Sequence, residues 1–293
     1  MAYVKNPLSV DISPDLTRLL AGAKTLTAQQ RATIVEELLA LNKRGMMNFN
    51  LEGRDLAGLN FAGLSVRYGS LTGADLSGAD FADSDFEGSW LDKANLAKAS
   101  LKGGHFRGAS FQGSKLNGAK LDATIFEGNN FIGADLTGVS ARNAAFAVSN
   151  MQESVIRDAD FRKADLANCN FGGATFENVD FSGANISRTN FAAKSFKKVN
   201  FEGAFLSECF LRGANLKDCN LKGVDLRYAN LEDADLSGLD LSNVNFAEAN
   251  IKGAQMRGTQ LEGAIFTGLN YQRIVSDPES ILARGIVAAK SAA

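Results

Sequence analysis

A large hydrophobic residue returns at every fifth position through most of this chain. The series runs from Leu51 to Tyr271 without a phase slip, and 37 of its 45 positions are Leu or Phe. Helices and ordinary strands repeat every 3.6 and every 2 residues, so neither element can bring such a series to one side. The chain must therefore adopt an architecture whose own repeat is five residues long.

The residues around each large hydrophobic residue are patterned as well. Two places before it, 37 of 44 residues are Ala, Ser, Thr, Val, Cys or Gly, and two places after it stand 23 of the 29 glycines. Asp or Asn directly precedes it in 26 of 45 cases, as Asp75 and Asp80 do, which favours turn residues over paired catalytic acids. We predict that the chain bends after each unit and coils around its apolar residues, with successive coils ~4.8 Å apart.

Units of the form A(D/N)LXX occur in dozens of copies, and through them the sequence resembles the pentapeptide repeat family over roughly residues 46–271. The resemblance implies an all-β solenoid, a right-handed quadrilateral β-helix in which four units form each coil of 20 residues. Residues 49–273 would then form about eleven coils and a rod ~50 Å long. It also implies a packed interior, so that function lies on the outer faces or at the ends.

The N-terminal segment of residues 1–45 lacks the repeat and is predicted to be helical. Ser13, followed by proline, is typical of the start of a short helix over 15–21. A capping box at 27–30 then precedes a second helix over 31–43 with one apolar face. We expect this segment to cap the first coil, whose apolar interior and strand edge would otherwise be open. The alternative is a helix that docks a partner or forms a dimer.

The C-terminal segment of residues 274–293 follows the repeat region of residues 46–273. Asp277, followed by proline, predicts a short helix with apolar residues that would cap the last coil. Both ends of the β-helix are therefore expected to carry short α-helical caps. In some family members a C-terminal element also forms the dimer, so a homodimer through the terminal helices stays open.

Composition argues against several chemistries. The formal net charge is -2, and the chain has one histidine and an odd number of cysteines, three. These residues leave little room for a multi-ligand zinc site, and the cysteines indicate a reducing compartment rather than a disulfide framework. No run approaches the ~18 apolar residues of a membrane span, and no signal segment is evident. We expect a cytoplasmic protein with no enzymatic activity, no cofactor and no metal, and no direct binding of nucleic acid.

Small apolar positions and charged columns have structural explanations. Cys169, Cys209 and Cys219 all occupy the small position and are interpreted as interior residues rather than redox or metal-binding residues. Residues 20 apart should stack on one face, so charges of opposite sign in one column would form a ladder along the rod. Such a column is formed by Arg67, Glu87, Arg107 and Glu127.

One outer face carries apolar residues at positions where Asp or Asn is usual, and Trp90 and Phe210 take the same position on the adjoining face. Exposed aromatic residues at such positions indicate a contact surface for a protein partner, and the alternative is local repacking at the corners of the coil. The candidate contacts are Trp90, His105, Ile125, Phe205, Phe210 and Tyr228. His105 is interpreted as packed or solvated, because no nucleophile or carboxylate accompanies it in a catalytic arrangement.

A modest basic patch is predicted on a neighbouring face. It could meet an acidic partner or phosphate, but Glu177 and Asp218 interrupt it, so ordinary solvated surface is the alternative. The patch consists of Lys194, Lys197, Lys198 and Lys217.

Three function classes fit these observations. The first is a non-catalytic scaffold that binds a protein partner, because the repeat is unbroken and contains no catalytic cluster. The second follows from a resemblance to the quinolone-resistance members of the family, which implies a DNA mimic that binds DNA gyrase or topoisomerase IV. Residues 51–271 hold 27 acidic and 22 basic residues, a net of five negative charges, far below the one charge per ~1.7 Å of duplex DNA. The third is a secreted effector or an architectural component of a larger assembly.

Overall fold

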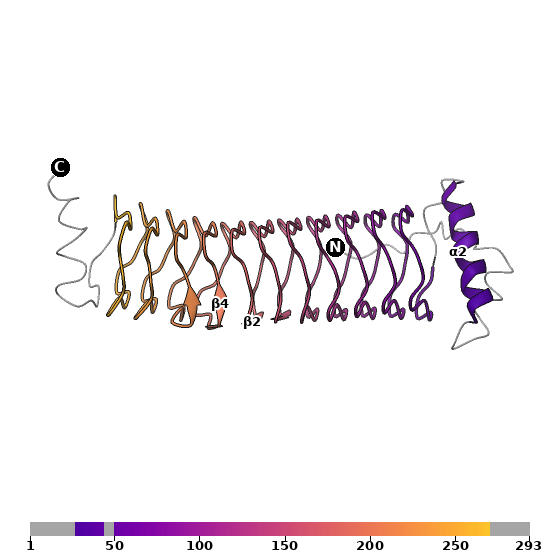
Figure 1. The fold of residues 1–293 in the computed structure, drawn as a ribbon, viewed down its shortest axis with the longest axis horizontal. Coiled ribbons are helices and arrows are strands. Elements are labelled where there is room, and N and C mark those ends of the chain that lie inside the picture. The colour runs from indigo at the N-terminus through magenta and orange to yellow at the C-terminus, as the bar shows by residue number, and fades with distance from the viewer. Residues whose placement is uncertain (1–26, 44–49, 270–293) are drawn as a thin grey trace, which may run out of the picture.

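The computed structural model describes residues 27–43 and 50–269. Residues 50–269 wind into a right-handed β-helix that forms a straight rod, and α2 (Ala28–Lys43) lies at its N-terminal end (Figure 1). The chain advances along the rod one coil at a time, so segments far apart in sequence meet only where their coils are neighbours. The predicted β-helical fold is confirmed.

Neighbouring coils pair in parallel, and each residue meets the residue 20 positions further on. Isolated bridges of this kind begin with Asn50 and Ser70 and continue to Asn245 and Ile265. Four units of five residues therefore make one coil. Where pairing extends beyond a single bridge, it forms two parallel sheets with strand orders β1-β2-β3 and β4-β5. The strands are β1 (Val155–Arg157), β2 (Thr175–Glu177), β3 (Phe196–Lys197), β4 (Val199–Asn200) and β5 (Cys219–Asn220).

The chain turns once in every unit, two places after the large hydrophobic residue. Gly78 has a φ of +64° there, and Lys98 has +60° at the same place in its own unit. The Asx residue before the large residue supports the turn, because the backbone N–H of Ser77 donates a hydrogen bond to Asp75 Oδ1 at 3.0 Å. The predicted turn role of Asp75 is thus confirmed, and it explains why the unit combines Asx with Gly.

The large hydrophobic residues fill the interior of the rod. All members of the series at positions 51–256 are buried. Phenylalanines one coil apart stack on each other, with ring centroids 4.8 Å apart for Phe61 and Phe81 and 5.5 Å apart for Phe181 and Phe201. Stacked aromatic pairs stabilise a core by ~0.5–1.5 kcal/mol beyond their burial. The predicted division between inward and outward positions is confirmed.

A capping box begins α2. The N–H of Thr27 donates to Gln30 Oε1 at 2.8 Å, and the N–H of Gln30 donates to Thr27 Oγ1 at 3.3 Å. The helix begins at Ala28, three residues before the predicted start, because Thr27 itself is the N-cap. Ile34 is fully buried in the same hydrophobic core as the coils, and Val35 packs against that core.

The helices predicted over 15–21 and within 274–293 lie outside the described residues. In the described part of the chain, no helix is both long enough and apolar enough to cross a bilayer.

Candidate partner-binding face

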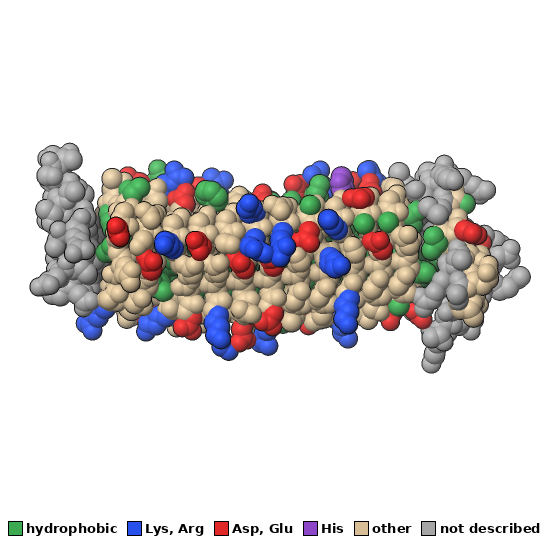
Figure 2. All heavy atoms as spheres, viewed as in Figure 1, with side chains coloured by type: hydrophobic (Ala, Val, Ile, Leu, Met, Phe, Trp, Pro, Cys, Tyr) green, Lys and Arg blue, Asp and Glu red, His purple; other side chains and the backbone are tan. Residues whose placement is uncertain are grey.

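One side of the rod differs from the other three in its exposed residues. It consists of residues 65–70 and the equivalent segments every 20 residues up to 265–269, and so covers one face of the coil and the first residue of the adjoining face; we call it the aromatic face. Every large hydrophobic side chain that is exposed in the described residues lies on it. In Figure 2 this face follows the upper rim of the rod, which the purple histidine marks. These exposed side chains are Tyr68, Val148, Phe205, Phe210, Tyr228 and Ile265.

The most strongly exposed aromatic residues lie close together near the C-terminal end of this face. Phe205, Phe210 and Tyr228 are 51%, 55% and 62% exposed. Phe210 and Tyr228 line a shallow hollow together with Cys209, Asn230 and an ion pair between Arg188 and Glu208 at 3.0 Å. The hollow therefore has two aromatic walls beside a neutralised charge pair.

The other predicted contacts lie on the same face but nearer its N-terminal end. His105 is exposed, whereas Trp90 and Ile125 are half-buried. Four of the six predicted contact residues lie on one face of the coil, and Trp90 and Phe210 lie at its edge, at the first position of the adjoining face. Sequence reasoning missed Tyr68, although an aromatic residue at the turn position of the unit, where glycine is most frequent, was a readable signal.

Three of the exposed apolar residues sit in a strained backbone conformation. Tyr68, Val148 and Tyr228 have φ values of +58°, +64° and +61° at the turn position that favours glycine. A left-handed conformation costs an ordinary residue roughly 1–2 kcal/mol, and it is least suited to a β-branched residue such as valine. Across the described residues, no other large hydrophobic side chain occupies such a turn. Seventeen other non-glycine residues of the described part adopt the same left-handed turn, so the aromatic face is distinguished by the apolar side chains that it exposes there.

The predicted charge ladder on this face is formed in part. Arg67 lies 3.5 Å from Glu87, and Arg107 lies 2.7 Å from Glu127. Arg67 also pairs with Asp85 at 2.6 Å, which holds the pKa of its guanidinium above the ordinary value. Exposed pairs of this kind contribute little to stability individually, but they leave the arginines neutralised.

The predicted basic patch is largely neutralised. Lys197 pairs with Glu177, and Lys217 Nζ lies 2.8 Å from Asp235 Oδ2. Lys194 is half-buried and donates to the carbonyl of Ala174 at 3.1 Å; its burial lowers the pKa of the ammonium group. Of the four, Lys198 alone is exposed without an ion pair to a described residue. Little free positive charge is left for an acidic partner.

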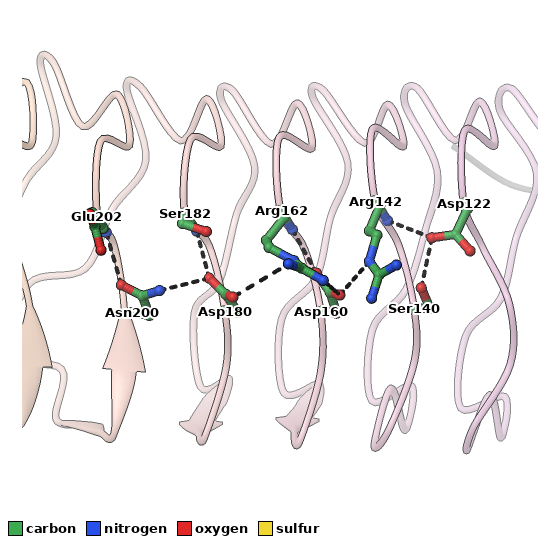
Figure 3. Close-up of polar contacts among 9 residues, drawn as sticks. All are labelled: Asp122, Ser140, Arg142, Asp160, Arg162, Asp180, Ser182, Asn200 and Glu202. Atoms are coloured by element: carbon green, nitrogen blue, oxygen red, sulfur yellow. Dashed lines mark hydrogen bonds and ion pairs between the residues drawn. The ribbon is translucent and has the colours of Figure 1, made fainter.

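A chain of polar contacts runs along the face that Figure 3 shows. Arg142 and Arg162 both bind Asp160, and Arg162 also lies 3.8 Å from Asp180 (Figure 3). Partial burial acts to raise the pKa of Asp160, but the hydrogen bonds from the two arginines outweigh it and lower that pKa to about 2. Acidic and basic side chains therefore cross-link neighbouring coils on this face.

We expect Asp160→Asn to lower the free energy of unfolding at pH 7 by about 1–2 kcal/mol, because it removes the charge-assisted hydrogen bonds from Arg142 and Arg162. The folded pKa lies below the unfolded one, so the stabilisation is present above pH ~4 and is lost as the pH falls towards 2. Urea unfolding of both proteins at pH 7 and pH 2.5 tests this. An equal difference at the two pH values would contradict the assigned role.

The cysteines are interior residues, as predicted. Cys169, Cys209 and Cys219 are buried free thiols, and burial raises their pKa values to about 12, 11 and 12. Cys169 Sγ donates to the carbonyl of Phe146 at 3.1 Å. Among the described residues, no group of three or more His, Cys, Asp or Glu side chains could hold a metal ion.

Comparison with known proteins identifies the repeat. A family model described as "Pentapeptide repeats" matches the chain in eight copies. None of the curated proteins matches the chain. The matched residues are 55–96, 91–128, 130–166, 154–192, 195–233 and 229–268.

Several solved structures are similar to this chain. HetL, a pentapeptide repeat protein involved in regulating heterocyst differentiation in the cyanobacterium Nostoc sp. strain PCC 7120, is 26% identical, with a TM-score of 0.45 over 84% of this chain and 98% of its own. A pentapeptide repeat protein from the Arabidopsis thaliana thylakoid lumen is 33% identical, with a TM-score of 0.27 over 32% of this chain and 63% of its own. QnrB1, a plasmid-mediated fluoroquinolone resistance protein, is 23% identical, with a TM-score of 0.27 over 73% of this chain and 92% of its own.

Proposed function

Because the chain belongs to the pentapeptide repeat family, we propose that it is a non-catalytic scaffold that binds a protein partner through the outer surface of a rigid β-helix. Members of this family are generally structural or interaction scaffolds rather than enzymes. The observation that carries the proposal is the collection of all exposed large hydrophobic side chains of the described residues on one face. Exposed apolar and aromatic residues gathered on one surface are typical of binding sites.

The proposal includes an organisation of the whole chain. Residues 46–273 form the rod of about eleven coils, residues 1–45 cap its first coil, and residues 274–293 cap its last. The burial of Ile34 in the core of the coils supports the N-terminal cap. The buried, unpaired cysteines support a reducing compartment such as the cytoplasm. Deletion of residues 1–45 is expected to cause aggregation, whereas loss of partner binding alone would indicate docking.

A DNA-mimicking role is less well supported. Mimicry of duplex DNA needs a surface dominated by negative charge. Here basic residues nearly balance the acidic ones, and some of the carboxylates form ion pairs, as in the contacts of Asp160 with Arg142 and Arg162. An assay of gyrase supercoiling with micromolar protein distinguishes the two roles, because a scaffold of the proposed kind would neither inhibit nor protect the enzyme.

Affinity capture from the native host, followed by mass spectrometry, tests the scaffold proposal. We expect the double variant Phe205→Asp/Phe210→Asp to lose the captured partner, because buried aromatic anchors at an interface commonly contribute 2 kcal/mol or more. Asn215→Asp/Asn220→Asp is the matched control, since these exposed residues precede the large residues of the other two faces in the same stretch of chain. Equal capture by both double variants and the wild type would refute a role for the aromatic face.

A further inference from the structure

We propose that the partner of the aromatic face is a second copy of this chain, bound face to face and antiparallel. The inference rests on the proposed function, because it names the occupant of the same surface. It starts from the exposed apolar side chains at the turns of Tyr68, Val148 and Tyr228. Among the described residues, these are the only large hydrophobic side chains at such turns, and all three are exposed.

The charged residues of the aromatic face have the composition of an interface. All twelve lysines of residues 50–269 lie outside its segments, whereas four of the ten arginines lie on it. Protein interfaces are depleted in lysine and enriched in arginine and aromatic residues. The four arginines, each ion-paired within the chain, are Arg67, Arg107, Arg188 and Arg227.

The spacing of the coils favours another β-helix over an α-helix as the partner bound to the aromatic face. The side chains of this face repeat every ~4.8 Å along the rod, and the face extends over ten coil steps from 65 to 265. A helix laid along it repeats every ~5.4 Å and would be half a period out of step after about four coils. Another β-helix of this chain keeps the same step throughout.

An antiparallel pair with full overlap places two exposed side chains of this face opposite glycines, although it also places Arg107 opposite Arg227. A two-fold axis through the middle segment, 165–170, places each column of one copy opposite the same column of the other copy. In the column of Asn168, the numbers of any two facing residues therefore have the same sum. Tyr228 then faces Gly108, and Glu208 faces Gly128. A Cβ atom at either glycine would have nothing within 4 Å, so both positions have room for an incoming side chain.

The chain itself shows that tyrosine can lie over a glycine of this column. The ring of Tyr68 covers Gly88 in the next coil, where an added Cβ would be 2.5 Å from its Cδ1. Tyr228 has Glu248, not glycine, in the next coil, and its ring stays 62% exposed. The second copy would supply the missing glycine, and in the neighbouring column Ile125 would face Phe205.

The size and charge of the face predict a weak dimer whose affinity rises with salt. A strip ~50 Å long and ~10 Å wide in each copy buries on the order of 1,000 Å², near the lower limit for specific interfaces. The face carries seven carboxylates and four arginines, so two copies repel each other and screening by salt reduces that repulsion.

Sedimentation equilibrium of the full chain at about 1–200 µM tests the inference, with an expected dissociation constant in the micromolar range. Tyr228→Gly is expected to weaken dimerisation about tenfold or more, because it removes one side chain at two symmetric places. Glycine suits the turn at Tyr228, so this variant should fold. Lys198→Gly is the matched control, since Lys198 has a φ of +52° at the same turn position on another face. A chain that is monomeric throughout, or equal effects of the two substitutions, overturns the inference.

Cysteine cross-linking tests the register. Asn168 lies in the middle segment, so Asn168→Cys should form a disulfide-linked dimer under mild oxidation, while the native thiols are buried. Asn178→Cys, at the same turn position on another face with a φ of +53°, should not. Equal cross-linking of both variants contradicts the pairing. If the chain stays monomeric but Phe205→Asp/Phe210→Asp still loses a captured protein, this inference fails and the proposed function stands. If the chain neither dimerises nor loses a captured protein in that variant, both fail.

Discussion

Phe181→Ala lowers the free energy of unfolding by about 3–5 kcal/mol, because it leaves a cavity that the stacked coils cannot close. The Phe181 side chain is fully buried, with its ring centroid 5.4 Å from that of Phe161 and 5.5 Å from that of Phe201. Both neighbouring coils are tied to its own by backbone hydrogen bonds, so neither can move inward without breaking that pairing. Equilibrium unfolding in guanidinium chloride measures the loss.

Lys198→Ala is the control for this cavity. Lys198 is exposed and pairs with no described residue, so its replacement should change stability by less than about 0.5 kcal/mol. Phe171→Ala and Phe176→Ala should resemble Phe181→Ala, since these residues are also buried members of the series. Comparable losses at Phe181 and Lys198 would contradict the division between inside and outside.

Gly104→Val is expected to cost about 2–3 kcal/mol, because the interior has no space for a side chain there. Gly104 occupies the small position of its unit. An added Cβ would lie 2.8 Å from the ring of Phe106, 3.0 Å from the carbonyl oxygen of Leu101 and 3.2 Å from that of Phe81. The two carbonyl groups belong to the backbone and cannot swing aside as a flexible side chain would. Thermal unfolding followed by circular dichroism measures the shift.

Gly108→Asn is the comparison for Gly104→Val, because Gly108 lies only four residues further along the same coil. Gly108 has a φ of +66° and open space around a Cβ, and Asn168 already occupies an equivalent turn with a φ of +59°. We expect a cost below about 1 kcal/mol, since asparagine tolerates the left-handed conformation. If this substitution were as costly as Gly104→Val, crowding could not be the reason for glycine at position 104.

The fold could be predicted from the sequence because one period determines both burial and register. A residue five places further on returns to the interior, and a residue 20 places further on returns to the same face. These two rules alone place Phe205 and Tyr228 on one surface. They also placed the cysteines inside, since the small position always points inward.

The fate of the long charged side chains could not be predicted in this way. Lys217 and Asp235 differ by 18 residues and occupy adjacent columns, so their contact depends on how each side chain bends. The same holds for Arg142 and Asp160, which are also 18 residues apart. Column rules therefore anticipate the pair of Lys197 with Glu177, which are 20 residues apart, but not the pair of Lys217 with Asp235.

The five-residue unit also restricts how such a rod can change its length. A deletion of one unit would rotate everything beyond it by a quarter turn, because four units complete a coil. Every later member of the aromatic face would then point away from the earlier ones, although the interior would pack as before. A deletion of 20 residues would shorten the rod by one step and keep all faces aligned. If function requires a continuous face, length variants that remain functional should differ by whole coils. If only the packing of the core is required, they can also differ by single units.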